Sequence, residues 1–98
     1  MKRIVVRYKA KPERAAENQR LIEAVFAELA ARAPDGIRYL ALKLGDGTFV
    51  HFVERDGDAN PLETMAAFRA FQTGIRERVA EPPVPSDAAI VGNYRMLA

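Results

Sequence analysis

The chain has 98 residues, which is enough for one domain, expected to span residues 1–98, and leaves no room for a second core. Apolar residues make up 49% of it, which excludes a disordered tail, and the absence of cysteine excludes disulfides and thiolate metal sites. The net charge is +2, with signs that alternate instead of forming a basic stripe, so we expect no nucleic-acid partner.

The first residues carry basic side chains followed by an apolar run, as the start of a signal peptide does. That run, residues 4–6, ends after three residues at Arg7, which is too short for the apolar region of a signal peptide. No other stretch approaches the length that crosses a membrane. We therefore expect a cytoplasmic protein with no membrane partner.

The first two elements follow from periodicity. Residues 3–9 alternate in the way of a strand. Pro12 then suits the first position of a helix, where its missing N–H costs nothing, and Glu13 faces the helix dipole. Apolar residues at helical spacing continue this helix to the turn at residues 33–36; they are Leu21, Ile22, Val25, Phe26 and Leu29.

A hairpin is predicted next, because two β-rich runs, residues 37–44 and 48–54, flank Gly45-Asp46-Gly47. With a three-residue loop, His51 shares a face with Tyr39. With a two-residue loop it shares a face with the leucines instead, because a one-residue slip reverses the faces of a strand. We favour the first register because it gathers the aliphatic residues together.

The second half begins with Asn60-Pro61-Leu62-Glu63, a capping signal that opens a helix expected to reach Val79. Gly74 weakens this helix and marks a bend or a close contact. The proline-rich residues 81–85 are expected to form an extended connector. Residues 87–97 then predict a last strand, with Ile90, Gly92, Tyr94 and Met96 on one face.

The resulting order is strand-helix-strand-strand-helix-strand, which is the ferredoxin-like βαββαβ arrangement of the α+β class. Two helices should cover one face of a four-stranded antiparallel sheet. The other face carries apolar residues, and a soluble monomer rarely exposes such a patch. We therefore expect a homodimer in which two copies pair through their sheets.

The chain resembles the dimeric α/β-barrel superfamily, and within it the antibiotic-biosynthesis-monooxygenase-like proteins. The resemblance rests on Lys11-Pro12-Glu13, on the Asp46-Gly47 hairpin with its strand at residues 49–53, and on the helix at residues 65–71. It implies two sheets that close into a barrel, with a pocket in each subunit between sheet and helices. Relatives include cofactor-independent monooxygenases and haem-degrading oxygenases. Both branches typically place a tryptophan in the pocket, and this chain has none.

Candidate catalytic residues are few. His51, the only histidine, is either a general base tuned near neutral pH, a haem ligand, or a buried histidine satisfied by a neighbour at the dimer interface. Tyr39 is a hydrogen-bonding partner for a phenolic substrate, or an ordinary strand tyrosine. One histidine without cysteine predicts no metal site. No cofactor is expected.

Aromatic and sulfur side chains are the candidates for ligand binding. They are Phe49, Met65, Phe68, Phe71 and Tyr94. This pattern fits a pocket for a small apolar or aromatic molecule, and equally a filled core. Two functions follow: binding or cofactor-independent oxidation of such a molecule, or a non-catalytic dimeric structural or regulatory module.

Overall fold

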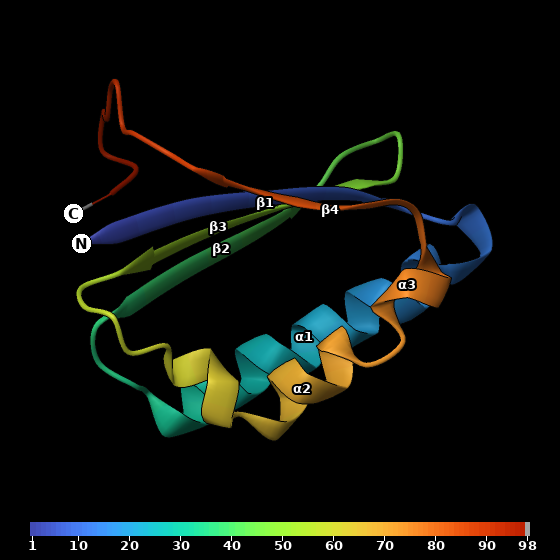
Figure 1. The fold of residues 1–98 in the computed structure, drawn as a ribbon, viewed down its shortest axis with the longest axis horizontal. Helices are drawn as coiled ribbons and strands as arrows, with labels where there is room; N and C mark the ends of the chain where they lie inside the picture. Colours follow the sequence, from blue (N-terminus) through green and yellow to red (C-terminus); the bar gives the residue numbers. More distant parts are fainter. Residues whose placement is uncertain (98) are drawn as a thin grey trace.

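A computed structural model describes residues 1–97 of the chain. The elements follow one another as β1 (Lys2–Ala10), η1 (Pro12–Arg14), α1 (Ala15–Arg32), β2 (Ile37–Lys43), β3 (Thr48–Arg55), η2 (Pro61–Thr64), α2 (Ala66–Gln72), α3 (Ile75–Arg78) and β4 (Val79–Asp87). Figure 1 shows two layers, with the sheet on one side and the helices on the other.

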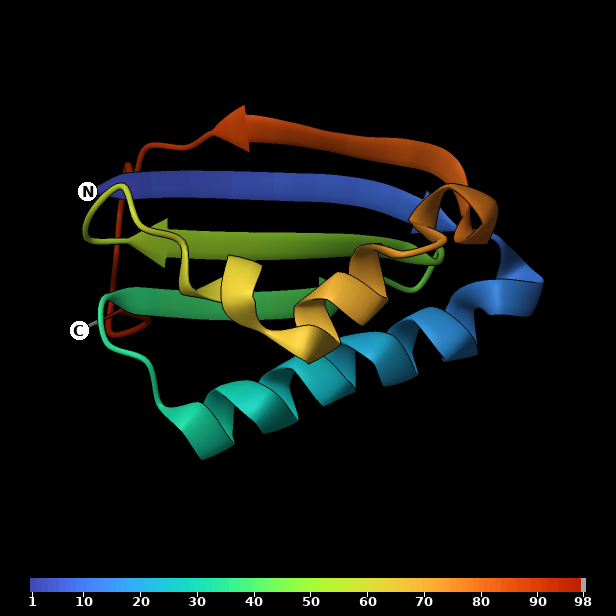
Figure 2. The ribbon, with the colours of Figure 1, turned by 60° about the horizontal axis from the view of Figure 1, so that its bottom comes forward.

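The sheet is antiparallel and has the strand order β2-β3-β1-β4. Figure 2 shows the strands side by side, with α1 and α2 lying under the same face. This is the predicted ferredoxin-like fold of the α+β class. In the residues described, no helix is both long and apolar enough to cross a membrane.

The first helix begins and ends near the residues that predicted its limits. Pro12 opens a short 3-10 turn that leads into α1. The helix ends at Ala33, which adopts the left-handed conformation with φ 45° and donates its N–H to the carbonyl of Leu29. Ile22 and Val25 are buried against the sheet.

The β2–β3 hairpin has the favoured register. Ala41 lies opposite His51, and the N–H of Leu44 bonds to the carbonyl of Thr48 across the three-residue loop. Tyr39 lies opposite Val53, two residues from His51, so both side chains point to the helix-covered face. The register therefore decides that His51 meets tyrosines and not leucines.

The sequence predicts one continuous second helix that reaches Val79. In the structure this segment is divided into η2, α2 and α3. Asn60 caps η2 by accepting the N–H of Leu62. Met65 and Thr73 have extended backbones at the two ends of α2. Gly74 takes φ +75° between α2 and α3, a conformation that a side chain strongly disfavours. The predicted bend at Gly74 is thus real, and it ends the helix instead of curving it.

The last strand was assigned to the wrong residues. β4 is the proline-rich segment Val79–Asp87, and residues 88–97 do not pair with the sheet as a strand. Proline is excluded from central strands because it lacks an N–H, but an edge strand tolerates it where that position faces away from its neighbour. β4 pairs only with β1, so it is such an edge.

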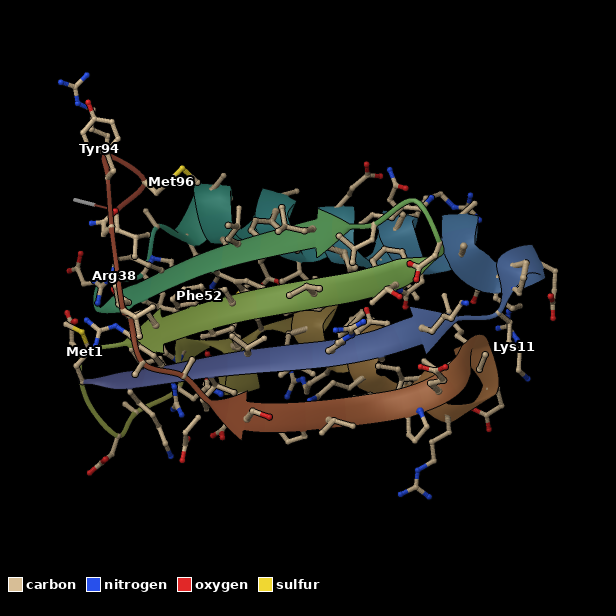
Figure 3. All side chains as sticks on the ribbon, turned by 90° about the horizontal axis from the view of Figure 1, so that it is seen from above. Met1, Lys11, Arg38, Phe52, Tyr94 and Met96 are labelled. Carbon is tan, nitrogen blue, oxygen red and sulfur yellow. The ribbon has the colours of Figure 1, made fainter. Side chains whose placement is uncertain are left out.

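The face of the sheet away from the helices is open. Figure 3 looks onto it and shows the C-terminal segment crossing one end. Most side chains on this open face are apolar, and Arg7 lies among them between Val50 and Val84; the apolar residues are Val5, Leu40, Leu42, Val50, Phe52 and Val84. Leu42 is 49% exposed and Val84 is 59% exposed, so this face lies outside the core of the single chain.

Candidate functional site

A cavity of about 310 Å³ lies between the sheet and the helices. Its walls are mostly apolar and aromatic, and they come from all four strands, η2, α2 and α3. The aromatic and polar residues among them are Tyr8, Tyr39, His51, Arg55, Asn60, Phe68, Phe71 and Gln72. This volume is within the range of small-molecule sites, and polar groups inside apolar walls are typical of such sites.

His51 is held between two tyrosines. Its Nε2 lies 3.0 Å from the hydroxyl of Tyr8 on β1, and its Nδ1 lies 2.5 Å from the hydroxyl of Tyr39 on β2. The ring is 3% exposed and stacks on Tyr8 with 5.4 Å between ring centroids. Because both nitrogens are engaged, the ring has none free for a haem iron. The histidine also faces the helices and not the open face, so a neighbour at a sheet-to-sheet interface does not satisfy it.

Asn18 and Arg78 extend the hydrogen bonds of Tyr8 and His51 into the core. Asn18 of α1 donates its side-chain N–H to the Tyr8 hydroxyl over 2.8 Å. Arg78 of α3 donates its Nε–H to the side-chain oxygen of Asn18 over 3.2 Å, and its other nitrogens donate to the backbone carbonyls of Phe71 and Thr73. Arg78 is 1% exposed, and in residues 1–97 every buried side-chain nitrogen and oxygen has a partner.

Burial sets the protonation of these groups. It lowers the pKa of His51 to about 4, so the imidazole is neutral at pH 7. It raises the pKa of Tyr8 to about 12, with the hydrogen bond from Asn18 acting in the opposite direction. Burial, together with Tyr8, also raises the pKa of Tyr39. The site therefore holds a neutral histidine between two protonated hydroxyls, with the pKa of His51 held below its usual range by burial.

The structure brings some of the predicted site residues together and separates others. His51, Tyr39, Phe68 and Phe71 line the cavity. Three other candidates lie elsewhere. Phe49 and Met65 are core residues, 2% and 1% exposed, and neither lines the cavity. Tyr94 is 79% exposed on the C-terminal segment, well outside the sheet in Figure 3, because that segment is not the last strand.

Sequence reasoning missed Asn18, Arg78 and Arg55. A signal for Asn18 was present, because it stands four residues before Ile22 and so extends the buried stripe of α1 with an amide. Arg78 gave no such signal, since its burial depends on the break at Gly74. Arg55 comes one residue after the predicted strand, and the structure extends β3 to include it, so alternation puts it on the same face as His51.

In residues 1–97, no three histidine or acidic side chains come together as metal ligands. The cavity walls carry no carboxylate, and the one charged residue among them is Arg55. The site therefore offers hydrogen bonds and a positive charge.

Comparison with known proteins gives the fold. No family model and no curated protein matches the sequence. Among solved structures, Rv0793 of Mycobacterium tuberculosis has a TM-score of 0.73 at 18% identity, with 93% of this chain and 95% of that chain covered. The chain therefore shares its fold with this protein.

Two further structures have names that mention an activity. A protein of Bacteroides thetaiotaomicron, provisionally named an antibiotic biosynthesis monooxygenase, has a TM-score of 0.74 at 16% identity, with 99% of this chain and 95% of that chain covered. A Caulobacter crescentus protein with the same provisional name has a TM-score of 0.70 at 22% identity, with 92% and 89% covered. The likeness bears out the antibiotic-biosynthesis-monooxygenase-like resemblance at the level of fold.

Proposed function

We propose that the protein binds a small, largely apolar aromatic molecule in the cavity beside His51. The composition of the cavity carries this proposal, because its walls combine aromatic and aliphatic side chains with a few polar groups, as small-molecule sites do. Phe68 and Phe71 supply flat apolar walls, and Tyr39 with His51 supplies the polar contact. A site of this composition holds an aromatic ring by contact area and orients it by one or two hydrogen bonds.

Oxidation without a cofactor is the reaction that the likeness in fold favours, and it remains a proposal for this chain. In such a reaction a CH₂ group beside an aromatic carbonyl or phenol loses a proton to water, and the resulting anion reacts with O₂. The CH₂ becomes C=O, one oxygen atom is retained and the other leaves as water. The Tyr39 hydroxyl would donate to the oxygen that gains negative charge. The neutral His51 would orient Tyr39 and would not take up the proton.

The alternative is a non-catalytic dimeric module with a structural or regulatory role. Oxygen uptake separates the two functions, with anthrone as the probe, because its CH₂ group is activated by the aryl ketone, and with its uncatalysed oxidation as the baseline. Uptake that rises with wild-type protein and not with Tyr39→Phe supports the enzyme. A probe that neither binds nor raises uptake above the baseline supports the non-catalytic module, and binding without uptake supports a ligand-binding protein that is not an enzyme.

A second copy of the chain is the proposed partner for the open face. Leu40, Leu42 and Val84 lie exposed there, and the same apolar patch on two copies is self-complementary about a two-fold axis. We expect sedimentation at micromolar concentration to give twice the 10.9 kDa of one chain, and Leu42→Glu to give 10.9 kDa. A wild-type species of 10.9 kDa would remove the dimer from the account.

A filled cavity tests the binding proposal directly. Val53 lines the cavity, so Val53→Phe places a ring in the space that the ligand needs. Val91, which is fully exposed on the C-terminal segment, gives the matched control Val91→Phe. We expect 1-naphthol, followed by its fluorescence, to bind the wild-type protein and Val91→Phe but not Val53→Phe. Equal binding by all three would place the ligand elsewhere.

A further inference from the structure

The hydrogen bonds that begin at Arg78 have a direction. A guanidinium group only donates, so the Asn18 oxygen must face Arg78, and the Asn18 NH₂ group must donate to Tyr8. Tyr8 then uses its own proton on Nε2 of His51. A neutral imidazole with an acceptor at Nε2 carries its proton on Nδ1, which donates to Tyr39. Each residue after Arg78 thus accepts a hydrogen bond from the one before it and donates one to the next, as far as Tyr39.

The opposite direction leaves a proton without an acceptor. If Nε2 of His51 carried the proton, it would donate to Tyr8, which already accepts from Asn18. The Tyr8 hydroxyl proton would then have no acceptor although this residue is 2% exposed, and such a buried orphan costs about 1–3 kcal/mol. Tyr39 lines the same cavity as Tyr8 but is only half-buried, so water or a ligand accepts its proton at no such cost.

We propose that Arg78 and Asn18 are positioning residues that fix Tyr39 as a hydrogen-bond donor into the cavity, so that the site selects aromatic ligands carrying an acceptor oxygen, such as a ketone. This inference rests on the proposed function for its ligand. Neither positioning residue lines the cavity, and both act through Tyr8 and His51. An acceptor oxygen on the ligand receives the hydrogen bond from the Tyr39 hydroxyl. A hydrocarbon of the same shape leaves that hydroxyl without an acceptor on the ligand.

The first test is the tautomer of His51, which is readable without overlap because the chain has one histidine. Nitrogen-15 spectra of the imidazole distinguish a protonated nitrogen from a bare one. We expect the wild-type protein to carry its proton on Nδ1. A proton on Nε2 would overturn the proposal, whether or not any variant folds.

The second test reverses the direction of the hydrogen bonds that run from Asn18 to Tyr39. Asn18→Asp keeps the shape and pairs with Arg78, but it offers Tyr8 an acceptor in place of a donor. Tyr8 should then donate to the new carboxylate, His51 should move its proton to Nε2, and Tyr39 should donate to His51 instead of to a ligand. A purely structural role of Asn18 would not move the tautomer. A folded Asn18→Asp protein that keeps the wild-type tautomer would overturn the proposal.

The consequence for ligands is measured with 1-tetralone and tetralin, which share a shape and differ in one carbonyl oxygen. We expect the wild-type protein to prefer 1-tetralone by roughly 3- to 10-fold, the effect of one hydrogen bond. Asn18→Asp and Tyr39→Phe should both lose this preference. Equal affinity of the wild-type protein for the two probes would contradict the proposed selectivity. If neither probe binds, the cavity-binding proposal fails, while the tautomer of His51 still decides the direction of the hydrogen bonds from Arg78 to Tyr39.

Discussion

The Tyr39 hydroxyl lies 2.5 Å from Nδ1 of His51, at the wall of the cavity between sheet and helices. The two residues meet because β2 pairs with β3 through a three-residue loop, which puts both side chains on the helix-covered face. Tyr39 accepts the proton of His51 and keeps its own for the cavity. That contact ties the fold to the proposed chemistry.

Stability should depend on pH through His51. Its pKa is about 4 in the folded chain and 6.5 when exposed, so the unfolded chain binds more protons between these values. The free energy of unfolding should therefore be constant above about pH 7 and fall by about 2 kcal/mol by pH 5, since each unit of pKa difference is worth about 1.4 kcal/mol. Urea unfolding at a series of pH values measures this.

His51→Gln is the control for that pH dependence, because the amide donates and accepts but does not titrate in this range. The carboxylates with lowered pKa, such as Glu54 and Asp56, affect stability only at lower pH. Between pH 7 and pH 5 the variant should show a flat profile. A wild-type profile that is equally flat would mean that His51 is not held neutral by burial.

Removal of Arg78 should destabilise the fold strongly. Arg78→Met keeps the bulk but leaves the carbonyls of Phe71 and Thr73 and the side-chain oxygen of Asn18 without their donor. The acceptors on Phe71 and Asn18 are buried, and each buried acceptor left unsatisfied costs about 1–3 kcal/mol, so a loss of at least about 2 kcal/mol is expected in urea unfolding. Arg76→Met, on the exposed side of the same helix, should change stability by less than about 0.5 kcal/mol. Similar losses for the two variants would contradict the buried role of Arg78.

Gly74→Ala should cost about 1–2 kcal/mol, because Gly74 takes φ +75° and an added Cβ is strained in that conformation. The nearest side-chain atoms would lie at ordinary contact distance, 3.7 Å at Glu77 and 3.8 Å at Arg78, so the cost is in the backbone. Gly92→Ala, where nothing lies within 4 Å, is the control in thermal unfolding. An unchanged midpoint for Gly74→Ala would show that the break between α2 and α3 is not fixed.

Arg55 should favour ligands with a negative charge. It is the one charged residue among those that line the cavity, and it stands four residues along β3 from His51, roughly 13 Å away. We expect 1-naphthoate to bind about fivefold more tightly than 1-naphthamide, the effect of an exposed charge pair. Arg55→Gln should abolish this preference in calorimetric titrations, and Arg69→Gln, on the exposed side of α2, should keep it. A preference that survives Arg55→Gln would assign the charge recognition to another residue.

Much of the fold was predictable because it depends on local rules. Pro12 marks the start of the first helix, the Asp46-Gly47 pair sets the hairpin, and the grouping of aliphatic residues selects the register that joins His51 to Tyr39. β4 was not predictable in this way. Its prolines argue against a strand locally, and only its place at the edge of the sheet, beside β1, makes them acceptable.

The site was predictable only in part, for a related reason. His51 and Tyr39 are strand residues whose faces follow from alternation, so their meeting could be derived. Asn18 and Arg78 meet Tyr8 through the packing of two helices on the sheet, and no spacing in the sequence encodes that contact. Tyr94 was predicted to bind the ligand because the last strand was assigned to the wrong residues. In the structure it is exposed to solvent.

The proposal that the cavity beside His51 binds an aromatic molecule is tested most directly at the histidine ring. With one imidazole in the chain, its nitrogen-15 and proton resonances report on the cavity alone. Titration of the wild-type protein with 1-tetralone should shift these resonances to saturation, and Val53→Phe should show no shift over the same range. Resonances of the wild-type protein that stay fixed up to the solubility limit of the ligand would contradict the account.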